Sequence, residues 1–147
     1  MTIANRDAQV SGLSILGYST VLPIVWLSLG GLLAAILPGT RTGVGGFCFV
    51  VLIVVLLTSW LFVRKHRRRF STREFWMLVG WCSLWAALCE SAGLLYAASV
   101  GLVDPSQTRM LTFAACFSFG LDAIIIVVGF GFTGRRFIDH YLAEHPE

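Results

Sequence analysis

The sequence predicts an all-α membrane protein with four transmembrane helices in an antiparallel bundle and both termini in the cytoplasm. The main observation is that four long stretches contain no Lys, Arg or His, namely residues 8–40, 42–63, 75–103 and 110–134. A helix of about 20 apolar residues crosses the ~30 Å hydrocarbon core of a bilayer, and each stretch is at least that long. The composition and the uneven distribution of basic residues support the same prediction.

Hydrophobic residues make up 56% of the chain and charged residues only 13%, whereas a soluble domain carries about 25% charged residues. The four stretches are apolar on every helical face, which suits lipid rather than water. The first apolar run is longer than the ~7–15 residues of a cleaved signal peptide, and we expect it to be retained as a helix. The sequence thus predicts one domain over residues 1–147, with helices at about 10–37, 43–63, 72–101 and 105–134.

Basic residues predict the orientation, because short basic loops resist translocation and stay in the cytoplasm. With four spans, both termini and the loop between the second and third helices lie on one side. That side holds nine of the eleven Lys and Arg residues, and the other side holds Arg41 and Arg109. The net charge of +3 is therefore interpreted as a topology signal, with no nucleic acid partner. The location predicted is the bacterial cytoplasmic (inner) membrane.

Local motifs place several helix ends. Ser71 and Glu74 have the spacing of a capping box, which begins the third helix near residue 72. Asp104 has the position of an N-cap residue for the fourth helix. Pro23 lies inside the first helix, where it removes a backbone hydrogen bond and predicts a kink. Residues 135–143 are expected to continue the fourth helix as an amphipathic tail.

Glu90 and Asp122 are single carboxyls in the third and fourth helices. At about 1.5 Å per residue they lie roughly 22 and 18 Å from opposite faces, so both are near the midplane. No basic residue lies at that depth, and at least one carboxyl is expected to be protonated. They are either a proton- or cation-binding site or neutral groups that hold helices together through Ser83, Ser91, Ser118 or a backbone carbonyl.

Small residues recur at spacings of three and four along the predicted helices, where they let backbones approach closely. They are expected to form seams within the chain, and a contact between two copies is the alternative. The candidates are Gly30, Gly31, Ala34, Ala35, Gly93 and Gly129.

A cluster of basic residues follows the second helix. It is interpreted as a topology signal that contacts anionic lipid headgroups, with docking of an acidic partner as the alternative. Its members are Arg64, Lys65, Arg67, Arg68, Arg69 and Arg73.

The sequence contains no pattern typical of an enzyme, a metal site or a cofactor site. All four cysteines lie inside predicted spans, and none forms a C-x-x-C pair. The three histidines, His66, His140 and His145, are dispersed without the spacing of metal ligands. We therefore expect no catalytic residues and no cofactor.

Two functions remain. The first is a membrane protein that recognises another membrane polypeptide, either an immunity protein against a pore-forming toxin or an accessory subunit, with a homodimer as a further possibility. Four spans, short loops and no catalytic motif are typical of this class. The alternative is a small proton-coupled exporter or ion-binding transporter that uses Glu90 and Asp122. Small four-helix multidrug exporters carry their essential glutamate in the first helix, and here that helix has no acid.

Overall fold

The computed structural model describes residues 10–36, 43–101 and 108–145, which are helical apart from short turns and contain no strand. Its elements in chain order are α1 (Gly12–Ser19), α2 (Val21–Ile36), α3 (Gly43–His66), α4 (Thr72–Ser99), α5 (Thr108–Val128), the π-helix η2 (Gly129–Gly134) and α6 (Arg135–Glu144). The Asp104 cap predicted above falls outside the described residues.

Within the described residues, four helical segments are long and apolar enough to cross a membrane. They are Gly12–Leu29, Cys48–His66, Thr72–Tyr96 and Ala115–Glu144. This supports the predicted class, an all-helical, multi-pass membrane protein.

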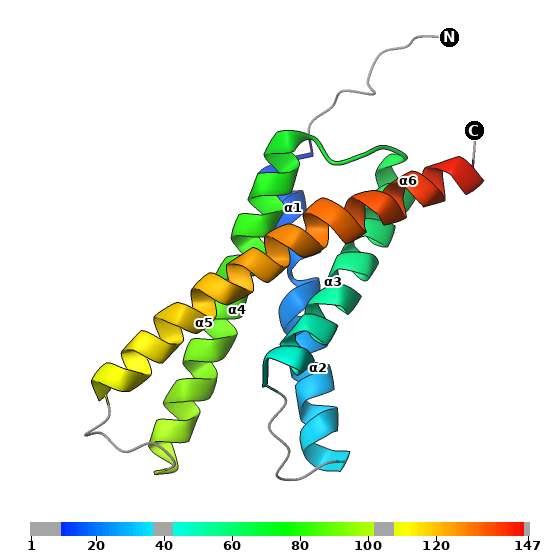
Figure 1. Cartoon of the computed structure of the whole chain (residues 1–147). Coiled ribbons are helices and arrows are strands. Elements are labelled where there is room, and N and C mark those ends of the chain that lie inside the picture. Colours follow the sequence, from blue (N-terminus) through cyan, green and yellow to red (C-terminus); the bar gives the residue numbers. More distant parts are fainter. Residues whose placement is uncertain (1–9, 37–42, 102–107, 146–147) are drawn as a thin grey trace.

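The helices meet most closely at one end of the molecule, here called the loop end because it carries the loop of residues 67–71 that joins α3 to α4 (Figure 1). The start of α1 and the end of α6 lie at this end too. α4 contacts α1 and α5, while α3 contacts α2, η2 and α6. Toward the opposite, far end, the α2–α3 pair diverges from the α4–α5 pair (Figure 1).

The buried core belongs mainly to α3 and to the first half of α4. Buried side chains include Val54 and Val55 of α3, Leu78 and Cys82 of α4, and Phe130 of η2. Among the described residues, Ala86 is the last buried one along α4. Beyond Ala86, the described residues of α4 therefore add no buried side chain to this core.

The first span contains a break, because α1 ends at Ser19 and α2 begins at Val21. Pro23 has no N–H to donate to the carbonyl of Ser19, four residues earlier, so one helical hydrogen bond is missing at this turn. A helical bond still crosses the break, since the Ile24 N–H donates to the carbonyl of Thr20 at 3.3 Å. The interruption predicted at Pro23 thus falls three residues before it.

The predicted capping box at the start of α4 is confirmed. The Glu74 N–H donates to Ser71 Oγ at 3.3 Å, and the Ser71 N–H donates to the Glu74 carboxylate at 2.8 Å. Two amides that the helix itself leaves unpaired are thereby satisfied, and the loop end of α4 has a fixed starting point.

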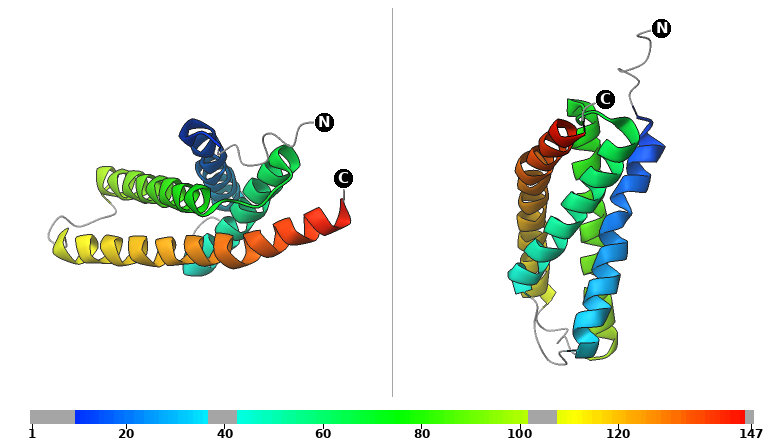
Figure 2. Two further views of the ribbon diagram at one scale, coloured as in Figure 1. Left: turned by 90° about the horizontal axis from the view of Figure 1, so that it is seen from above. Right: turned by 90° about the vertical axis from the view of Figure 1, so that its right-hand side faces the viewer.

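The fourth span continues through η2 into α6 as one curved rod (Figure 2). Two glycines that bound the π-helix face α3. A Cβ on Gly129 would lie 3.0 Å from Val55 Cγ2, and one on Gly134 would lie 3.0 Å from Ser59 Oγ. Positions five apart are roughly 140° apart around an α-helix, and the wider π turn brings them to nearly the same face. The π-helix thus lets both glycines contact one neighbour.

Candidate functional site

The packing of α4 against α5 brings the two intramembrane carboxyls together. Ser118 Oγ donates a hydrogen bond to Glu90 Oε1 at 2.8 Å. Asp122 lies close enough to Glu90 for the two carboxyls to interact electrostatically. Ser118 and Asp122 are one helical turn apart, so both project from the same face of α5 toward α4. These three residues are called the carboxyl site below.

Burial differs across the carboxyl site. Asp122 is only 4% exposed, and its Oδ2 atom has no hydrogen-bond partner among the described residues. Glu90 is half-buried. Two charged carboxylates close together repel each other, and a proton on one of them or a cation between them would relieve this repulsion. The side-chain oxygens of these three residues are of the kind that binds a hard cation.

The other chemistry-bearing side chains do not gather in this way. Within the described ranges no three His, Cys, Asp or Glu residues lie close enough together to hold a metal ion. Cys48 and Cys116 are exposed, Cys82 is buried, and Cys89 is intermediate.

The carboxyl site lies next to a segment of the α4–α5 pair that the other helices leave largely exposed. We call this segment the arm, made of residues 91–99 of α4 and 112–120 of α5. Every residue from 91 to 96 is exposed. Six consecutive residues go more than once around a helix, so every face of this stretch of α4 is at least partly open. Large apolar side chains dominate the arm, with Leu95 71% and Phe113 75% exposed.

The small residues predicted to form seams have different surroundings. Gly129 lies at a close contact with α3. Gly93 belongs to the arm, and a Cβ built there would meet no atom within 4 Å. Gly30, Gly31, Ala34 and Ala35 lie in α2, but their packing falls outside what the structure describes.

At the loop end, Glu74 forms a second polar centre, with its side chain only 2% exposed. Its carboxylate accepts two hydrogen bonds from Arg68, at 2.6 and 2.8 Å. The backbone N–H of Val10 adds a third bond at 2.9 Å, and that of Ser71 a fourth at 2.8 Å. These contacts, called the latch below, join the entry of α1, the loop and the start of α4.

The remaining basic residues of the loop region lie at its surface. Arg69 pairs with Asp139 of α6 at 2.6 Å. Arg64 lies over the ring of Trp60, 5.1 Å from its centroid. Lys65, Arg67 and Arg73 are exposed. The sequence predicted a basic cluster here, but adjacent arginines carry no local signal that would single out Arg68 as the partner of Glu74.

Comparisons with protein families, with curated proteins and with solved structures find no match to this chain.

Proposed function

We propose that the chain is a bacterial cytoplasmic-membrane protein that recognises another membrane polypeptide through the arm. The observation that supports this most is the exposure of every residue from 91 to 96. Lipid hydrocarbon can surround Leu95, but it offers no hydrogen bond to the Ser91 hydroxyl or to the half-buried carboxyl of Glu90. A second polypeptide can supply both apolar contact and polar partners.

The chemistry of the arm defines that partner. It is an apolar helix with a hydrogen-bond donor or a cation at mid-membrane depth, where it meets Glu90. Around that point it needs a shape that fits Gly93, because small residues let helices approach closely in lipid. A pore-forming toxin held inactive by an immunity protein meets this description, as does the core of a complex that takes up an accessory subunit.

In the proposed orientation the loop end faces the cytoplasm, and the spans form an antiparallel bundle. Nine of eleven Lys and Arg residues belong to that side, as the positive-inside rule requires. Alkaline phosphatase fused after Glu147 should be inactive in a bacterial host, and the same enzyme inserted within residues 103–108 should be active. The reverse pattern would contradict the orientation.

Site-specific photocrosslinking in native membranes tests recognition by the arm. A photoreactive residue at Tyr96, which is 68% exposed, should give one discrete adduct. The same residue at Ile24 of α2, 62% exposed, should give none. Gly93→Leu should abolish the Tyr96 adduct, and Gly80→Leu should preserve it. Gly80 is the matched control because it lies on the same helix and also faces open space.

Equal adducts at Tyr96 and Ile24, or an adduct insensitive to Gly93→Leu, would contradict recognition by the arm. An adduct with a second copy of the chain would replace the proposed partner with a homodimer.

A second candidate function is proton- or cation-coupled transport, and the unpartnered Oδ2 of buried Asp122 favours it. The purified chain in liposomes with an entrapped pH-sensitive dye separates the two. If the chain is a recognition protein, it carries no flux, and Glu90→Gln and Asp122→Asn keep the Tyr96 adduct because amides retain hydrogen bonding. A flux that both substitutions abolish would instead establish the transport function.

A further inference from the structure

A pocket lies at the loop end, between the loop and the α6 segment that follows η2. Its volume is about 240 Å³, and it is lined by Arg69, Phe70, Arg135, Ile138 and Asp139. A water molecule occupies roughly 30 Å³ in the liquid, so the pocket has room for a larger group. Its loop residues Arg69 and Phe70 lie between the apolar span that ends at His66 and the one that starts at Thr72, and its other lining residues lie near the end of the span Ala115–Glu144. This is the depth of lipid headgroups when the spans are in a bilayer.

Consecutive arginines of the loop have different surroundings. Arg68 is engaged by the buried carboxylate of Glu74 in the latch. Arg69 pairs with Asp139, and both side chains are largely open, at 71% and 45% exposure. An exposed pair of this kind contributes little to folding. Arg69 is therefore available for a ligand at small cost to the fold.

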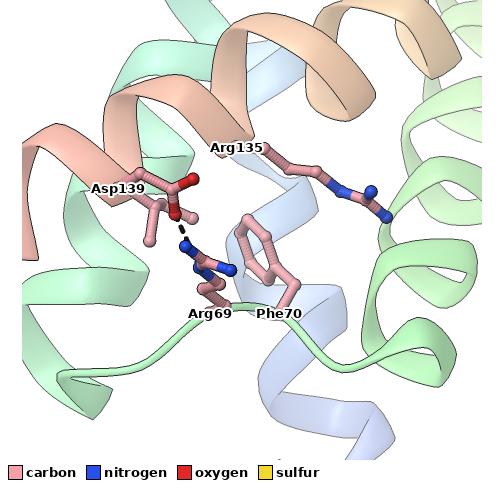
Figure 3. Close-up of a pocket in the computed structure, with 5 residues that line it drawn as sticks. Arg69, Phe70, Arg135 and Asp139 are labelled. Atoms are coloured by element: carbon pink, nitrogen blue, oxygen red, sulfur yellow. Dashed lines mark ion pairs between the residues drawn. The ribbon is translucent and has the colours of Figure 1, made fainter.

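Arg135 is the less engaged of the two cations in the pocket. Its guanidinium lies 5.4 Å from the centroid of the Phe75 ring, and no carboxylate in the described ranges pairs with it. In Figure 3 the Phe70 ring stands between the Arg69–Asp139 pair and the Arg135 side chain. Two arginines and one aspartate line the pocket, and the Arg135 guanidinium, which points away from the Arg69–Asp139 pair (Figure 3), reaches a ligand there only by leaving the Phe75 ring.

We propose that this pocket binds a phosphate group, with Arg135 as the principal cation and Arg69 as the second. Guanidinium groups donate paired hydrogen bonds to phosphate oxygens, and these outcompete a cation–π contact with a phenyl ring. Phe70 and Ile138 give the pocket an apolar side, which suits a phosphate attached to a hydrophobic body. Asp139 opposes an anion, and its pairing with Arg69 limits that repulsion. The proposal is independent of recognition by the arm, which lies toward the far end.

Two sources present this chemistry, an anionic lipid headgroup and a soluble phosphate. Native mass spectrometry of the full chain in neutral detergent distinguishes them, with phosphatidic acid, phosphatidylcholine and inorganic phosphate as probes. Phosphatidic acid should be retained in preference to phosphatidylcholine. If millimolar inorganic phosphate does not displace it, the ligand is the lipid, and if it does, the ligand is the soluble anion.

Charge-matched variants test the site itself. Arg135→Gln should weaken phosphatidic acid retention about tenfold, the effect of losing one charge-assisted hydrogen bond. Arg136→Gln removes the same charge from the next residue, which lies over Phe132 at 4.1 Å and does not line the pocket. That variant should bind nearly as the parent does. Asp139→Asn should strengthen retention severalfold because it removes the opposing carboxylate and releases Arg69.

The gain expected from Asp139→Asn cannot arise from misfolding, so the pair of variants keeps the test decisive. Equal weakening by Arg135→Gln and Arg136→Gln would show diffuse attraction to a basic surface and overturn the site. Unchanged or weaker retention by Asp139→Asn would overturn it as well.

Discussion

Glu74 and Glu90 are carboxyls of the same helix, and the protein surrounds them in opposite ways. Glu74 accepts four hydrogen bonds, two of them from Arg68. Glu90 accepts one from Ser118 and faces another acid, Asp122. A buried charge with a matched cation and full hydrogen bonding belongs to the folded framework. A carboxyl in a membrane span without a basic partner keeps bonding capacity for a proton, an ion or another chain.

The packing of α4 also differs between the regions around Glu74 and Glu90. Near Glu74 the helix contributes Phe75, Leu78 and Val79 to the buried core. Beyond Glu90, residues 91–96 are all exposed. One helix therefore combines a part that packs into the core with a part that the described residues leave exposed.

The largest effect is expected from Glu74→Ala. It leaves Arg68 without its carboxylate and the N–H groups of Val10 and Ser71 without their acceptor, so the free energy of unfolding should fall by about 3–5 kcal/mol. Thermal unfolding of the purified chain in detergent, followed by circular dichroism, measures this. Glu90→Ala should cost only about 1 kcal/mol, because one hydrogen bond is lost. Equal losses would remove the distinction between the two carboxyls.

An intermediate effect is expected from Gly134→Val. The Cβ would lie 3.0 Å from Ser59 Oγ and 3.3 Å from Val55 Cγ1, and overpacking of this kind costs about 1–3 kcal/mol. Gly93→Val on the arm meets open space and should change stability by under about 0.5 kcal/mol. The same unfolding assay compares them, and a larger loss at Gly93 would mean that the arm is packed within the chain.

The smallest effect is expected at the exposed Arg69–Asp139 pair. A double-mutant cycle with Arg69→Gln and Asp139→Asn should give an interaction energy below about 1 kcal/mol, and added salt should reduce it further. A salt-insensitive value of several kcal/mol would place this pair with Glu74 in the framework and would remove Arg69 as a readily available cation.

Local sequence patterns predict the helices and several of their ends, but they do not predict contacts between residues that are distant in the sequence. Ser71 and Glu74 are close in the chain, so the capping box could be predicted from their spacing. The depth of a residue in the membrane could also be predicted, because the rise per residue of a helix is constant. That depth placed both Glu90 and Asp122 near the midplane. Whether the two side chains meet depends on how α4 and α5 are rotated about their axes, and that requires the packed structure. The bond from Val10 to Glu74 spans 64 residues, and no local pattern predicts it.

The π-helix Gly129–Gly134 has a consequence for the rotational phase of the chain's last helix. A π turn is an α turn with one residue added, so the residues that follow it lie about 100° behind the phase they would have in an uninterrupted α-helix. Asp139 faces Arg69, and Ile138 is buried, in this shifted phase. The same residues wound as a plain α-helix would turn that whole face away from the loop, whereas deleting one residue together with the π turn would keep it in place. The six-residue segment therefore works as an angular spacer that sets which side of α6 meets the rest of the protein.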